Sequence, residues 1–106
     1  MAGTGTKRAA IDISTNTTTT IITTNASEYF NIMKIFLHSS GTNGVTFKSG
    51  STVICGKLDL VAQERFIQES CDTVPWYSGI AAGDDFTITT TASVQLSGTV
   101  VYTLTT

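Results

Sequence analysis

The chain is short, sparsely charged and close to neutral. It has 106 residues, of which 13% are charged and 41% hydrophobic, and its formal net charge is −2. This composition excludes a polybasic nucleic-acid binder, whose affinity comes from many Lys and Arg contacts to phosphates. It also excludes a disordered chain, which needs more charge and fewer apolar residues. The length fits one domain with one hydrophobic core, and no apolar run is long enough to span a membrane.

Composition also predicts the fold class. Thr makes up about a fifth of the chain, and β-branched residues are stiff at χ1 and favour the pleated surface of a strand. We therefore expect an all-β domain. Residues 1–8 are small and interrupted by Gly, and they carry Lys7 and Arg8. They predict a short flexible N-terminal arm, followed by a folded domain over residues 9–106.

The third predicted strand is the longest and most apolar. Residues 9–14 and 17–24 predict two shorter strands, and an Asn-Ala-Ser turn leads to residues 29–39. There, one face shows Tyr29, Met33, Ile35 and Leu37, and the other shows Phe30, Ile32, Phe36 and His38. A strand that is apolar on both sides must be covered on both. The opposite sheet of a sandwich would cover one face, and a partner subunit or a docked arm the other.

The remaining segments alternate at period two between turn residues. Strands are predicted at 45–48, 52–60, 85–91 and 99–104, and residues 72–83 are loop-like. Within residues 61–70, positions 62–65 fit the start of a helical turn, but 65–68 fit a short strand better. About eight short strands with regularly spaced turn signals predict a single β-sandwich that is jelly-roll-like.

Residues that could support catalysis or metal binding are few. His38 is the one histidine and ends an apolar strand, so we assign it a structural or surface role. Cys55 and Cys71 are interpreted as free thiols, with a bridge between them as the alternative in an oxidising medium. With His38 they are too few and wrongly spaced for zinc. Asp84 and Asp85 lack the spaced acidic pattern of a calcium loop, and we interpret them as two solvated carboxylates in a turn. We predict no catalytic, cofactor-binding or metal-binding residue, and a protein that is not an enzyme.

One aromatic pair has two interpretations. Trp76 and Tyr77 carry large apolar faces with polar handles, which suits the stacking of a sugar ring. With Asp84 and Asp85 nearby they would form a glycan-binding site. The same rings also suit a plug that closes one end of a sandwich, and we favour the plug.

Several segments carry a resemblance to a known class of proteins. They are residues 34–38, 45–51 and 56–60, the Pro75-Trp76-Tyr77 loop, and residues 81–84, 86–89 and 94–102. In this order they resemble small structural proteins of tailed bacteriophages, of the β-sandwich head-decoration, cement or fibre type. The resemblance covers residues 9–104 and implies no catalytic residues. Residues 63–71 are more charged than it implies, and they are a candidate partner-specific surface.

The resemblance implies a virion structural protein on the capsid surface, synthesised in the bacterial cytoplasm. Its expected partners are further copies of itself, as a dimer or trimer, and the major capsid protein, with no nucleic acid and no membrane. The low charge and the two-sided apolar strand agree with a subunit that forms apolar interfaces. The residues expected at such an interface are Lys7, Arg8, Phe30, Ile32 and Phe36. The alternative is a tail-fibre or receptor-binding module that recognises host carbohydrate through Trp76, Tyr77, Asp84 and Asp85.

Overall fold

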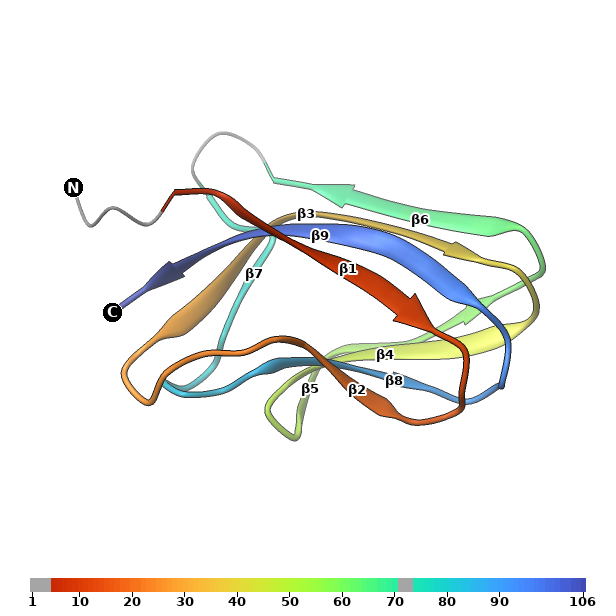
Figure 1. Ribbon diagram of the computed structural model, residues 1–106, viewed down its shortest axis with the longest axis horizontal. Coiled ribbons are helices and arrows are strands. Elements are labelled where there is room, and N and C mark those ends of the chain that lie inside the picture. Colours follow the sequence, from red (N-terminus) through yellow and green to blue (C-terminus); the bar gives the residue numbers. More distant parts are fainter. Residues whose placement is uncertain (1–4, 71–73) are drawn as a thin grey trace.

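The protein is a β-sandwich. A computed structural model describes residues 5–70 and 74–106, and within them nine strands form two antiparallel sheets packed face to face (Figure 1). The strands are β1 (Lys7–Ile13), β2 (Thr18–Ile22), β3 (Tyr29–Ser39), β4 (Asn43–Ser49), β5 (Thr52–Leu60), β6 (Glu64–Glu69), β7 (Tyr77–Ser78), β8 (Phe86–Thr90) and β9 (Leu96–Thr105). The all-β prediction is confirmed. No helix in the described residues is long and apolar enough to cross a membrane.

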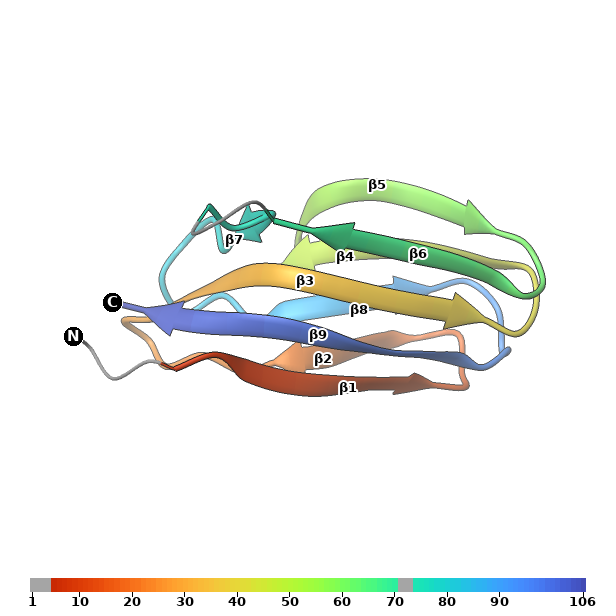
Figure 2. The same cartoon turned by 90° about the horizontal axis from the view of Figure 1, so that it is seen from above.

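The strand order is that of a jelly roll. One sheet, here called sheet A, has the order β1-β9-β3-β6, and β7 pairs with the N-terminal part of β3, beyond the end of β6. The other, sheet B, has the order β2-β8-β4-β5. Without the two-residue β7, the first long strand pairs with the last, the second with the second-last, and so on inward, which is the nested pairing of a jelly roll. Figure 2 looks onto sheet A, with β6, β3, β9 and β1 lying in front of sheet B.

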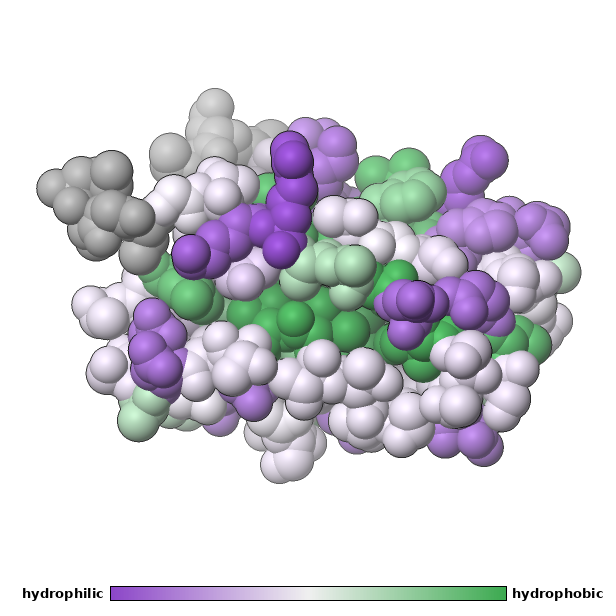
Figure 3. Space-filling view, in the orientation of Figure 1, coloured by the Kyte–Doolittle hydropathy of each residue, from purple (hydrophilic) through white to green (hydrophobic). Residues whose placement is uncertain are grey.

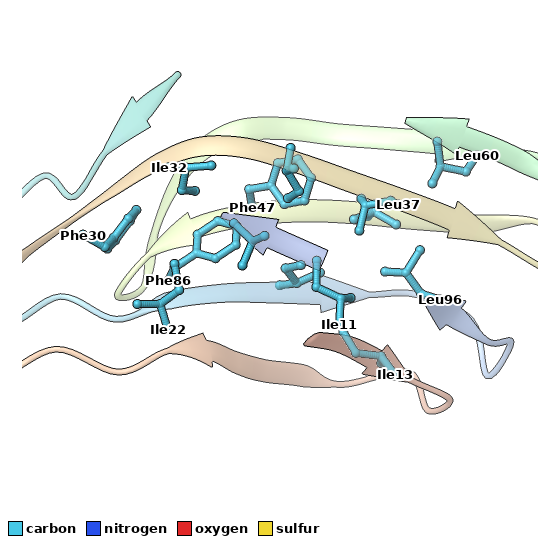
Figure 4. Packing of buried hydrophobic residues seen from close by; sticks show 14 residues of the cluster. Ile11, Ile13, Ile22, Phe30, Ile32, Leu37, Phe47, Leu60, Phe86 and Leu96 are labelled. Atoms are coloured by element: carbon cyan, nitrogen blue, oxygen red, sulfur yellow. The ribbon is translucent and has the colours of Figure 1, made fainter. Parts of the chain in front are cut away.

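The core lies between the two sheets and is made by alternate residues of most strands. Phe30, Phe47 and Phe86 are its largest fully buried side chains. Aliphatic residues from both sheets surround them (Figure 4): Ile11, Ile13, Ile22, Ile32, Ile35, Leu37, Val45, Leu60, Ile88, Leu96 and Val100. On the side where β1 and β2 are the edge strands, the apolar interior is visible as a band between the sheets (Figure 3).

A β-bulge in β3 changes which residues face the core. The pairing of β3 with β9 shifts register between Ile32 and Lys34, so Met33 is the extra residue. Phe30 and Ile32 point inward before the bulge, and Ile35 and Leu37 point inward after it. The predicted division of this strand into two continuous faces is therefore wrong. An extra residue exchanges the two faces, and an apolar sequence on both sides gives no sign of where that happens.

The predicted elements differ from the structure mainly at their ends. β1 begins at Lys7 rather than at residue 9, and Lys7 and Arg8 pair with Tyr102 and Val101. These two residues thus belong to the sheet and not to the arm, because the partner strand β9 extends far enough to pair with them. Residues 1–4 of the predicted arm lie outside the described residues. The ambiguous segment after β5 forms the strand β6, as favoured from the sequence.

Candidate interaction surface

The outer side of sheet A carries an ordered set of side chains. Strand registers place them in three rows that run across β1, β9, β3 and β6. The first row is Arg8, Val101, Lys34 and Glu69; the middle row is Ala10, Thr99, Phe36 and Ile67; the third row is Asp12, Ser97, His38 and Arg65. We call these twelve residues the sheet A outer face. In the described part of the chain no third layer covers them (Figure 2).

The middle row of this face is its apolar part. Ile67 is 56% exposed, Ala10 and Thr99 are exposed, and Phe36 is half-buried beside them. Val101 is a half-buried neighbour in the first row. An isolated exposed isoleucine needs no explanation, but one aligned with a phenylalanine across a sheet forms a continuous apolar strip. This strip is where the outer side of β3 and β6 can bury area against another surface.

The residues predicted for an interface do not lie together: two are in the core, and the others lie outside it on strands of sheet A. Phe30 and Ile32 are fully buried between the sheets, so they contact their own core and not a partner. Their assignment is corrected because the bulge at Met33 places them on the inner side. Phe36 and Arg8 do lie on the sheet A outer face, and Lys7 is exposed at the start of β1.

Ile67, Arg65 and Glu69 lie on the same face. They were not named singly as interface residues, but they fall within residues 63–71, the predicted partner-specific surface. The sequence did contain a signal for them, since residues 63–71 are unusually charged for this chain. Only strand pairing shows that they stand next to Phe36 and Lys34. Cys71 lies outside the described residues.

Trp76 packs into one end of the sandwich. Its ring lies 5.8 Å from that of Phe47, 5.9 Å from Phe66 and 4.6 Å from Tyr77, measured between centroids. Trp76 and Tyr77 are both half-buried, and Tyr77 pairs with Ile32 through β7. These contacts are the ones expected of a plug. They use ring surface that stacking on a sugar would require.

The Asp84 and Asp85 carboxylates do not project into solvent; they accept hydrogen bonds that hold the loop before β8 in place. The Ser49 hydroxyl donates to Asp84 Oδ2 at 2.8 Å and accepts from the Ile80 N–H at 2.9 Å. The Thr24 N–H donates to Asp85 Oδ1 at 2.9 Å. Both carboxylates are half-buried, so the interpretation of this pair as two solvated charges in a turn is corrected. Their oxygens join the ends of β2 and β4 to the segment that precedes β8.

Ser49→Ala should lower the free energy of unfolding by about 1–3 kcal/mol, because Ser49 is fully buried and its loss leaves the Ile80 N–H without this acceptor. Ser51→Ala is the matched control, because Ser51 is exposed in the turn between β4 and β5. This substitution should change the free energy of unfolding by no more than about 0.5 kcal/mol. Urea denaturation of both variants measures the difference. Equal values for the two variants would show that the Ser49 network contributes no stability.

The other residues considered as catalytic or metal-binding candidates do not form a common site in the described part of the chain. His38 Nε2 lies 3.0 Å from Gln63 Oε1, in a surface contact between β3 and the turn before β6. Cys55 is a free thiol on the edge strand β5, and burial raises its pKa. In residues 5–70 and 74–106 no group of three or more His, Cys, Asp or Glu is placed to hold a metal ion.

Comparison with known proteins finds a distant structural neighbour. No protein-family model matches the chain, and no curated protein matches it. A solved structure of Bacillus endospore appendages, described as a family of disulfide-linked pili, is similar with a TM-score of 0.44 and 20% sequence identity. The similarity covers 96% of this chain and 87% of the other. At that TM-score it supports no conclusion about function or assembly, and it does not bear on a phage origin.

Proposed function

We propose that this protein is a non-enzymatic structural subunit that associates with other subunits through the sheet A outer face. The observation that carries the proposal is the exposed apolar row of Phe36 and Ile67, which lies on a sheet side that no described segment covers. Subunits of permanent assemblies bury such apolar area and surround it with polar residues. Here the first and third rows supply that polar surround.

The more specific proposal is a decoration or cement protein of a tailed bacteriophage head. It rests on the sequence resemblance over residues 9–104, and the jelly-roll sandwich agrees with it. In this proposal the protein binds the major capsid protein as a homo-oligomer on the capsid surface. The structure gives the receptor-binding alternative no added support, because Trp76 packs on Phe47 and both Asp84 and Asp85 accept hydrogen bonds from their own chain.

The test is binding of the purified protein to heads of the phage that encodes it. We expect the unmodified protein to co-sediment with heads. Ile67→Asp should bind about tenfold more weakly or worse, because loss of oligomerisation removes the avidity of several linked contacts. Val53→Asp is the matched control, since Val53 is 53% exposed on β5 in the other sheet, and it should bind like the unmodified protein.

Two results would overturn the decoration proposal. One is failure of the unmodified protein to bind heads at any concentration. The other is binding to host glycans without binding to heads, which would favour the receptor-binding module instead.

A further inference from the structure

Four charges mark the corners of the sheet A outer face. Arg8 and Glu69 end the first row, and Asp12 and Arg65 end the third. Each row spans four strands, and the two charged rows lie four residues apart along β1 and β6. With about 4.8 Å between strands and 3.4 Å per residue, the corners outline a square with sides of about 14 Å. The sign of the charge alternates around this square.

The corner charges are free to meet charges on another molecule. Arg8, Asp12, Arg65 and Glu69 are all exposed. The ion pair found among residues 5–70 and 74–106 joins Lys57 to Asp59 on β5, so no corner is paired with another described residue. Asp12 also accepts a hydrogen bond from Gln95 Nε2 at 2.6 Å, which holds its carboxylate at the edge of the face.

We propose that the partner of the sheet A outer face is a second copy of the same face, related by a two-fold axis that runs parallel to the sheet and midway between the two faces. An axis along the strands places Arg8 opposite Glu69 of the second copy and Asp12 opposite Arg65. An axis along the rows places Arg8 opposite Asp12 and Arg65 opposite Glu69. Either axis brings opposite charges together at all four corners, because the signs alternate around the square. Opposite charges of this kind fix register and partner choice.

The same arrangement buries the apolar row. Two sheets that pack face to face lie about 10 Å apart with their strands roughly aligned. At that spacing Phe36 and Ile67 of one copy contact the middle row of the other, and the exposed isoleucine acquires an apolar environment. With the axis along the strands, Ala10 and Thr99 lie opposite Ile67 and Phe36 of the second copy, and their small size leaves room for these larger side chains. The apolar row thus supplies the buried area and the corners supply the specificity.

The size of the face sets the expected affinity. Four strands by about seven residues give a flat area of roughly 450 Å² per copy, or about 900 Å² in total, which is smaller than a stable interface and typical of a weak one. The dimer is therefore a concentration-dependent one, and it is to be measured by sedimentation equilibrium from about 1 µM to about 1 mM. Unmodified protein that remains monomeric over this whole range would overturn the proposal.

Charge reversal tests the arrangement. Arg8→Glu should lower the association constant about tenfold or more, because the two-fold axis introduces each like-charge contact twice. Lys57→Glu is the control: it makes the same change in net charge on sheet B and should leave the constant unchanged. Ile67→Asp should abolish the dimer. Equal effects of Arg8→Glu and Lys57→Glu would mean that net charge alone matters, which contradicts the proposal.

Two double variants identify the axis. Arg8→Glu with Glu69→Arg restores the dimer if the axis runs along the strands, and Arg8→Glu with Asp12→Arg restores it if the axis runs along the rows. Recovery by one of them supports the proposal, and recovery by neither overturns it. The inference rests on the proposed structural role, but its test needs no capsid. A monomer that binds heads would refute the dimer and leave attachment to the head intact. A dimer that binds no heads would support the dimer and overturn the decoration proposal.

Discussion

Gly98→Ala is expected to be the most destabilising small change in this protein. Gly98 lies in β9 opposite Leu37 of β3, where the two backbones come unusually close. A Cβ at this position would collide with the carbonyl oxygen of Phe36 and lie 2.8 Å from its carbonyl carbon. These atoms belong to the two central strands of sheet A and cannot move without breaking the pairing. We expect a loss of about 3 kcal/mol or more in the free energy of unfolding.

Gly56→Ala is the control for this prediction. Gly56 also lies within a strand, but a Cβ added to it meets nothing within 4 Å. Alanine should be neutral or stabilise the strand by about 0.5 kcal/mol, because glycine loses more backbone entropy on folding. Thermal melting of both variants should separate them by roughly 10–20 °C. Melting temperatures within a few degrees of each other would show that the β3–β9 contact is not as close as described here.

Phe47→Ala should lower the free energy of unfolding by a similar amount, because Phe47 lies at the centre of a cluster of aromatic rings. Phe47 is fully buried on β4. Its ring lies 5.8 Å from those of Phe66, Trp76 and Phe86, which come from both sheets and the loop before β7. Truncation of a buried phenylalanine removes its transfer free energy and leaves a cavity, so the expected cost is about 3–5 kcal/mol.

The single tryptophan makes the Phe47 prediction easy to measure. The chain has one Trp, and Trp76 contacts Phe47 edge-on, so its fluorescence reports both unfolding and the local change. Ile67→Ala is the control, because Ile67 is 56% exposed on the outer side of sheet A. In dilute solution, where the proposed dimer is dissociated, it should cost less than about 0.5 kcal/mol. A Phe47→Ala variant as stable as Ile67→Ala would contradict the described core.

The strands themselves could be predicted from the sequence because their signals are local. The predicted bounds of residues 29–39 and 52–60 match β3 and β5, where a long apolar run and a period-two alternation, respectively, lie between turn residues such as Gly50. The preference of Trp76 for a plug over an exposed site also agrees with its contacts to Phe47 and Phe66.

Other features depended on contacts between residues far apart in the chain. Asp84 and Asp85 looked like solvated turn residues, but Ser49 and Thr24 reach them from other strands. Ser49 and Asp84 are 35 positions apart, so no local pattern indicates their bond. Gly98 likewise lies just outside the strand predicted over residues 99–104, and only the approach of Phe36 explains why a side chain is excluded there.

By itself, the sequence determined an all-β sandwich, most of its strands and the unusual apolar character of β3, because strand propensity and alternation act between near neighbours. The tertiary structure alone decided which side chains of β3 face outward, because one extra residue at Met33 reverses the faces without changing the composition. It also decided that Arg8, Asp12, Arg65 and Glu69 surround one apolar row. Those residues come from the first and sixth strands, and only the jelly-roll order places β1 and β6 at opposite edges of one sheet.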